Sequence, residues 1–320
     1  MTSTTTGIFL PYAGADPDLT DYLTFTVAVG GGPAHSMVMD TGSVGIVVPA
    51  SRIVRSTPMS PQPPAPSYSS SGNTYDGEWV LATVELTAGD GQSFTTARPV
   101  AVFAATAKPG QPEPGVSMMG VGIRHQPGSP PLGLLNPFFN LPEMAAGQFR
   151  TGYILTRDGV QFGHDEAEMG TFATFPTNCG CPDTTPVATV TLAPPAGSGL
   201  HPYTDTAPFL LDTGISYMIV TPRQGQAQPD AGYEETLGTQ TQLVGGVGVS
   251  LVLGTETIWE FDTVDCGQPG TPAYARFARP STAGIINTGR HLLKSYDYLV
   301  DVQLGADGAT GVVGLRPARS

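Results

Sequence analysis

The sequence predicts a mostly β protein built as two lobes of similar plan, and three observations support this. The chain holds 41 glycines and 31 prolines among 320 residues, a composition that favours short strands joined by turns. Runs of β-branched and alternating apolar residues recur between those turns. A distinctive segment also occurs twice, once in each half of the chain.

The expected strands follow one another along most of the chain. They span 22–29, 36–40, 45–49, 78–87, 98–106, 151–157, 186–192, 209–212, 217–222, 248–254, 296–304 and 311–317. Helices are expected only over 141–149 and 289–296. The proline-rich stretch 58–67 cannot sit inside a sheet and is expected to form an exposed loop.

The repeated segment places an aspartate after large apolar residues. "MVMDTGSVGIVVP" (37–49) recurs as "FLLDTGISYMIVTP" (209–222), so Asp40 and Asp212 each begin an Asp-Thr-Gly turn. "SMMGVG" (117–122) follows the first copy and "GIINTG" (284–289) follows the second. One such tripeptide alone is an ordinary surface turn after a strand. Two copies in matching contexts predict one equivalent turn in each lobe.

Two such turns meeting at a pseudo-two-fold axis would bring Asp40 and Asp212 face to face. Two carboxylates at hydrogen-bond distance cannot both ionise easily, so they share a proton over a broad pH range. The ionised partner can take a proton from a bound water, and the protonated partner can donate one to a carbonyl oxygen. This arrangement would hydrolyse an amide without a covalent intermediate.

These segments resemble the two-lobed, pepsin-like aspartic proteases, and the likeness covers nearly the whole chain. "YLTFTVAVGGGPAHSMVMDTGS" resembles the family's opening strands and first active-site loop, and "FLLDTGISYMIVTP" resembles its second loop. "NLPEMAAGQFRTGYILTRDGVQFG" resembles the end of the first lobe, and "GRHLLKSYDYLVDVQLGADGATGVVGLRP" the C-terminal helix, strand and hairpin. The resemblance implies a bilobal pepsin-like fold with lobes at 1–164 and 165–320.

The resemblance also implies roles for the residues of both turns. Asp40 and Asp212 would be the catalytic pair. The neighbouring residues would support that pair through hydrogen bonds across the lobe junction, backbone amides near the carboxylates, or a hydroxyl on the outer oxygen of Asp40. These supporting residues are Thr41, Gly42, Ser43, Thr213 and Gly214.

A hairpin flap that covers the substrate is expected within 67–86. Tyr68 and Tyr75 compete for the role of the family's flap tyrosine, and the spacing to the second flap strand favours Tyr68. Either tyrosine could instead be a half-buried strand aromatic. Val47 stands where the family often has a tryptophan, so the flap tyrosine would lose its usual hydrogen-bond partner. Trp79 is a candidate substitute.

Two further features concern the pockets and the second turn. Met118 and Met119 are candidates to line substrate pockets, although both also fit a plain core. Ile215 stands where the family usually has a hydroxyl beside the second aspartate. Aligning the C-terminal segment places Asn287 and Thr288 on the positions that the two methionines occupy in the first lobe. The support for Asp212 would then differ, either by an insertion or by polar contacts.

Charge and apolar patterning limit the partners. The formal net charge is −13 and lysine is almost absent, so neither nucleic acid nor an anionic membrane is expected to bind. No apolar run approaches the ~18 residues of a membrane span, and the first residues do not form a secretory signal. The compartment stays open: secreted or periplasmic if a leader was removed, otherwise cytoplasmic. We expect a monomer that acts on a peptide or protein substrate.

No metal or other cofactor is expected. Cys179, Cys181 and Cys266 form no zinc-like cluster with histidines, and one disulfide from Cys266 to either of the others would leave an odd thiol. Motifs of serine hydrolases, zinc proteases, P-loop proteins and dinucleotide-binding proteins are absent from the sequence. The main alternative to an active protease is an inactive protein of the same fold that binds peptides or resembles an inhibitor.

Overall fold

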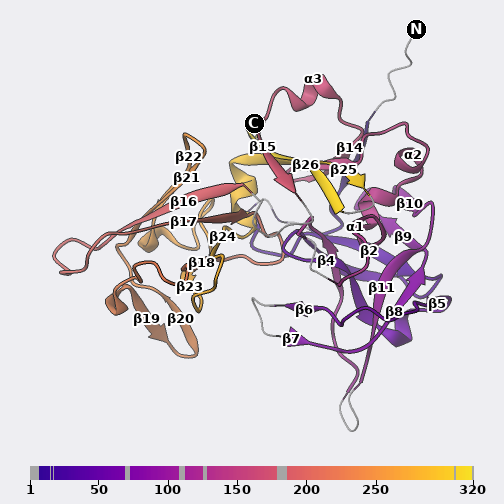
Figure 1. Cartoon of the computed structure of the whole chain (residues 1–320), viewed down its shortest axis with the longest axis horizontal. Coiled ribbons are helices and arrows are strands. Elements are labelled where there is room, and N and C mark those ends of the chain that lie inside the picture. Colours follow the sequence, from indigo (N-terminus) through magenta and orange to yellow (C-terminus); the bar gives the residue numbers. More distant parts are fainter. Residues whose placement is uncertain are drawn as a thin grey trace.

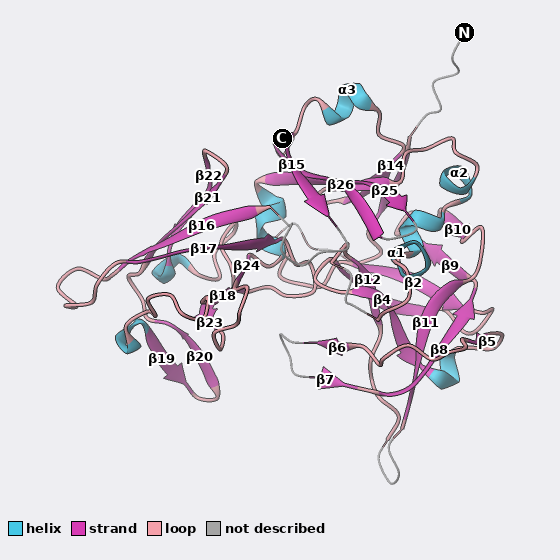
Figure 2. Ribbon diagram, in the orientation of Figure 1, coloured by secondary structure: helices cyan, strands magenta, loops and turns pink. Residues whose placement is uncertain are grey.

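Among the residues that the structure describes, the strands form three large sheets and two small hairpins, and the mostly β prediction is confirmed (Figures 1 and 2). The computed structural model describes residues 7–14, 16, 18–68, 73–107, 112–124, 128–178, 186–305 and 308–318. The α-helices among them are single turns: α1 (Leu132–Leu135), α2 (Pro142–Ala145) and α3 (Glu166–Met169).

A nine-stranded sheet forms the first lobe. Its order is β10 (Ser93–Thr95), β9 (Val84–Thr87), β2 (Thr24–Val29), β3 (His35–Asp40), β12 (Met118–Val121), β4 (Val44–Pro49), β11 (Val100–Thr106), β8 (Asp76–Ala82) and β5 (Thr57–Pro58). The single strand expected over 78–87 is wrong, because the chain changes partners at Thr83. Before that residue β8 pairs with β11, and after it β9 pairs with β2.

A seven-stranded sheet forms the second lobe, on the opposite side of the molecule in Figure 1. Its order is β22 (Glu256–Asp262), β21 (Gly248–Leu253), β16 (Val187–Ala193), β17 (Tyr203–Leu210), β24 (Ile285–Asn287), β18 (Met218–Thr221) and β23 (Ala275–Phe277). The hairpin β19 (Glu234–Leu237) and β20 (Gln240–Leu243) belongs to this half, and the hairpin β6 (Ser67–Tyr68) and β7 (Asn73–Thr74) to the other. The sequence prediction missed five strands of this half, namely β19, β20, β22, β23 and β24.

The third sheet joins the two halves of the chain. Its order is β1 (Ile8–Pro11), β14 (Gly159–Phe162), β13 (Gly152–Leu155), β25 (Tyr296–Gly305), β26 (Gly308–Pro317) and β15 (Ala173–Asn178). Strands from both ends of the sequence therefore lie in one sheet. The predicted lobe boundary at residue 164 falls between β14 and β15, and the division itself remains a prediction.

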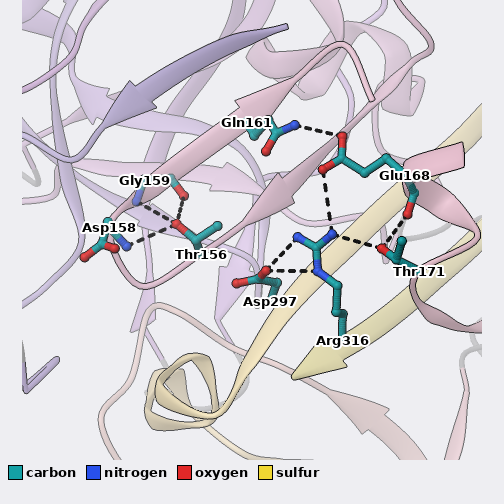
Figure 3. A network of polar contacts seen from close by, with 8 residues as sticks. All are labelled: Thr156, Asp158, Gly159, Gln161, Glu168, Thr171, Asp297 and Arg316. Atoms are coloured by element: carbon teal, nitrogen blue, oxygen red, sulfur yellow. Dashed lines mark hydrogen bonds and ion pairs between the residues drawn. The ribbon is translucent and has the colours of Figure 1, made fainter. Parts of the chain in front are cut away.

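A network of buried polar contacts fastens this sheet to α3 (Figure 3). The guanidinium of Arg316 on β26 donates to the carboxylate of Asp297 on β25 at 2.7 and 3.2 Å, and to the Thr171 hydroxyl at 2.9 Å. Glu168 of α3 lies 3.7 Å from the same guanidinium and accepts from Gln161 of β14 at 2.8 Å. Asp297 is only 4% exposed, so the hydrogen bonds from Arg316 offset the cost of burying its polar side chain.

The expected helices are shorter in the structure. Of 141–149 only α2 is helical, and Gly147, at a φ of +70°, leaves the right-handed helical region soon after it. In place of a helix over 289–296 there is one 3₁₀ segment, Arg290–Lys294. The stretch 58–67 is a loop except at its two ends, as expected.

Two remaining expectations concern membranes and cysteines. Within the described ranges, no helix combines the length and the apolar character that crossing a membrane requires.

The thiol of Cys266 is free, and burial together with nearby Asp265 and Asp262 raises its pKa to about 11. Cys179 and Cys181 lie outside the described residues.

Candidate active site

The two Asp-Thr-Gly turns meet at the junction of the lobes. The backbone N–H of Thr41 donates to the hydroxyl of Thr213 at 3.0 Å, and the N–H of Thr213 donates to the hydroxyl of Thr41 at 3.0 Å. Each hydroxyl also donates to a carbonyl of the opposite lobe, Thr41 to Leu211 at 2.5 Å and Thr213 to Met39 at 2.7 Å. The hydrogen bonds expected between these threonines are thus present, and they lock the two turns together.

The glycines of the turns allow the two carboxyl groups to approach each other. A Cβ added at Gly42 would lie 2.4 Å from the carboxyl carbon of Asp212, and one added at Gly214 would lie 2.6 Å from Oδ1 of Asp40. Both distances are shorter than any real Cβ contact. Each turn therefore packs its glycine directly against the aspartate of the other turn. Both aspartates are 5% exposed.

Asp40 receives the two donors that the sequence predicts. The backbone N–H of Gly42 donates to its inner oxygen Oδ1 at 2.7 Å, and the hydroxyl of Ser43 donates to its outer oxygen Oδ2 at 2.5 Å. These bonds offset the cost of burying a carboxylate at the end of a strand.

Asp212 also receives two donors, one of which the sequence prediction missed. Gly214 donates its N–H to Oδ1 at 2.9 Å, which matches Gly42 in the other lobe. The outer oxygen Oδ2 accepts from the side-chain amide of Asn287 at 2.6 Å. Ile215 cannot supply this bond, so Asn287 provides the side-chain donor that the second turn itself lacks.

Strand register explains how Asn287 reaches Asp212. On β24, Asn287 pairs with Leu210, two residues before Asp212. On β12 of the first lobe, Met118 pairs with Val38, two residues before Asp40. Asn287 therefore occupies the place of Met118, as the alignment of the C-terminal segment predicts. Of the two alternatives left open for this segment, polar contacts are the correct one.

The surroundings of Asp212 alter its ionisation. Burial is the largest influence on Asp212 and raises its pKa well above the ordinary value, and the charge of Asp40 and a hydrogen bond with Asp40 raise it further. Donation from Asn287 and Gly214 offsets only part of this rise. These influences favour the protonated form of Asp212 at pH values where an ordinary aspartate is ionised.

Comparison with known proteins tests the architecture. No protein-family model and no curated protein match the chain. Among solved structures, the crystal structure of basic 7S globulin from soybean matches with a TM-score of 0.53 at 14% identity, over 97% of this chain and 95% of that chain. The fold is pepsin-like. At this level of identity the match establishes the architecture alone.

Of the two candidate flap tyrosines of this pepsin-like fold, Tyr68 lies nearer the pair. Burial raises its pKa above the ordinary value, the charge of Asp40 raises it further, and a hydrogen bond with Ser43 lowers it. The ring of Tyr75 packs edge to face against Tyr68, with centroids 6.0 Å apart. A chain of polar contacts therefore runs from Tyr68 through Ser43 to Asp40.

Two candidate substrate-binding residues have other surroundings. Trp79 is 2% exposed and its indole N–H donates to the carbonyl of Pro64 at 2.8 Å, so it does not replace the missing partner of the flap tyrosine. Met119 has no exposed surface and packs in the main core, which contradicts its assignment to a pocket. Met118 is half-buried beside Trp79 and remains a candidate.

The sequence prediction also missed Arg290, which lies behind the second turn. Its guanidinium is buried and donates to the carbonyls of Leu19 and Thr20, both at 2.8 Å, and to that of Thr213 at 3.4 Å. The ring of Tyr22 lies 4.9 Å from the guanidinium carbon. Arg290 thus fixes an N-terminal segment against the turn that carries Asp212. The residues around Arg290 in the sequence would equally fit an exposed arginine at the end of a helix, so no local signal could have identified this role.

In the described ranges of the chain, no group of three or more His, Cys, Asp or Glu side chains is arranged so that it could bind a metal ion. At the junction of the lobes, Ser43 and Asn287 hydrogen-bond the outer oxygens of the two aspartates, and Tyr68 lies next to Ser43.

Proposed function

We propose that this protein is an aspartic endopeptidase that hydrolyses peptide bonds with a water activated between Asp40 and Asp212. The observation that supports the proposal is the buried pair itself, whose carboxyl groups pack against the glycines of the opposite turns and would share one proton. Asp40 would take a proton from the water as it attacks the carbonyl carbon, and Asp212 would donate its proton to the carbonyl oxygen. The tetrahedral diol would then collapse: Asp212 takes a proton back from one hydroxyl, Asp40 gives its proton to the leaving nitrogen, and the C–N bond breaks without a covalent intermediate.

The substrate would bind as an extended peptide between the lobes, where backbone hydrogen bonds to strands supply affinity. The hairpin that carries Tyr68 would close over it, since this tyrosine is already linked to Asp40 through Ser43. We expect a monomer with no nucleic-acid or membrane partner.

A rival function is supported by one observation. The second turn carries Ile215 where the first carries Ser43, and such a departure suits a protein of this fold that binds peptides without cleaving them. Incubation with casein or denatured haemoglobin from pH 3 to 7, with and without a statine-type inhibitor, separates the two. Cleavage that the inhibitor blocks and Asp40→Asn abolishes supports the protease. Peptide binding by calorimetry without turnover at any pH overturns it.

Tyr68→Phe should lower kcat/KM by up to about tenfold. The substitution removes the hydroxyl that hydrogen-bonds Ser43, and a neutral hydrogen bond contributes about 0.5–1.5 kcal/mol. Tyr75→Phe is the matched control, because it keeps both rings and the Tyr68 hydroxyl, and it should leave kcat/KM unchanged. Equal losses in the two variants would contradict the assignment of Tyr68. Steady-state kinetics on a fluorogenic peptide provide the measurement.

A further inference from the structure

The donors on the outer oxygens of the two aspartates differ in kind. The hydroxyl of Ser43 can donate or accept as it rotates, whereas the amide nitrogen of Asn287 only donates. The orientation of this amide is fixed, because the backbone N–H of Gly289 donates to its oxygen at 3.0 Å. The outer oxygen of Asp212 is therefore always faced by a donor.

This arrangement distinguishes the two oxygens of Asp212. The bond from Asn287 to the outer oxygen is 2.6 Å long, and the bond from Gly214 to the inner oxygen is 2.9 Å. In a protonated carboxyl group the carbonyl oxygen is the better acceptor and the other oxygen carries the hydrogen. The shorter bond marks the outer oxygen as the carbonyl oxygen. The proton is then favoured on the inner oxygen Oδ1, which lies with Oδ1 of Asp40 beside Gly214.

We propose that Asn287 is a positioning residue that replaces the missing hydroxyl at Ile215 and places the acidic proton of Asp212 on its inner oxygen, toward Asp40. Asn287 thereby directs the proton of Asp212 toward Asp40, while its donated hydrogen bond stabilises the charged form of Asp212. The role of Asn287 in catalysis rests on the proposed function, whereas the effect of Asn287 on the proton of Asp212 does not.

Four variants test the proposal. Asn287→Leu removes the donor at similar volume, and Asn287→Asp keeps the shape and the acceptor for Gly289 but replaces the donor by a carboxylate. Ile215→Ser combined with Asn287→Leu restores a donor in the first-lobe manner. Ile286→Leu, a conservative core change on the same strand, is the control. Carboxyl ¹³C NMR of aspartate-labelled protein, assigned with Asp212→Asn, follows the titration of the pair without requiring activity.

The upper apparent pKa of the pair should rise by about one pH unit in Asn287→Leu, because loss of a donor destabilises the charged form of Asp212. It should also rise in Asn287→Asp, return toward the wild-type value in the double variant, and stay unchanged in Ile286→Leu. The alkaline limb of kcat/KM should move in parallel. An unchanged upper pKa in both Asn287 variants would overturn the proposal. A shifted pKa in a protein that cleaves nothing would support it while refuting the protease.

Discussion

Thr213→Val should destabilise the protein by about 4 kcal/mol. The substitution keeps the volume but removes a hydroxyl that accepts from the N–H of Thr41 and donates to the carbonyl of Met39. Both partners are buried, and each unpaired buried group costs about 1–3 kcal/mol. Because the two bonds cross the lobe junction, their loss should also disturb the approach of Asp40 to Asp212.

Equilibrium unfolding in urea measures this effect, and Thr177→Val is the matched control. The hydroxyl of Thr177 is also buried but has no hydrogen-bond partner among the described residues. Its removal should therefore be neutral or stabilising. A similar loss of stability in both variants would show that the threonine pair is not a special element of the fold.

Asp212→Asn should reduce peptide hydrolysis at least about a thousandfold, because the pair loses the acid that protonates the carbonyl oxygen. Asn keeps an acceptor for the N–H of Gly214 but cannot supply an acidic proton. The comparison is made at the pH optimum of the wild type under single-turnover conditions. Residual activity within tenfold of the wild type would exclude Asp212 from the chemistry.

The same variant should alter how stability depends on pH. The pKa of Asp212 is raised in the folded state, so between the unfolded value of about 3.9 and the folded value the native state holds more protons than the unfolded state. Wild-type stability from this group is therefore full below about pH 4 and falls as pH rises, by at most about 1.4 kcal/mol per pH unit.

Asp212→Asn should thus gain stability relative to the wild type between pH 4 and the upper pKa of the pair. Urea unfolding at half-unit intervals from pH 3.5 to 7 provides the curve, with Asp76→Asn, at an exposed carboxylate, as the control. A constant difference between Asp212→Asn and the wild type across this range would contradict the raised pKa.

The sequence predicted the features that depend on local chemistry repeated in two places. Glycines, prolines and alternating residues indicated short strands, and two Asp-Thr-Gly copies identified both carboxylates. The resemblance to pepsin-like proteases implied the hydrogen bonds between their threonines. Element lengths were less predictable. Residues 78–87 look like one strand, yet they divide where the chain changes partners, and 289–296 has the pattern of a helix but forms only a 3₁₀ segment.

By itself, the sequence of this protein determined that two equivalent turns exist and which residues form them, because each turn is built from neighbours in the chain. Only the tertiary structure decided what surrounds those turns. It placed Asn287 on Asp212 across 75 residues, Tyr68 rather than Tyr75 beside Ser43, and Arg290 behind Thr213. Such contacts depend on strand register and on how separate segments pack. A local pattern of residues does not predict either of these.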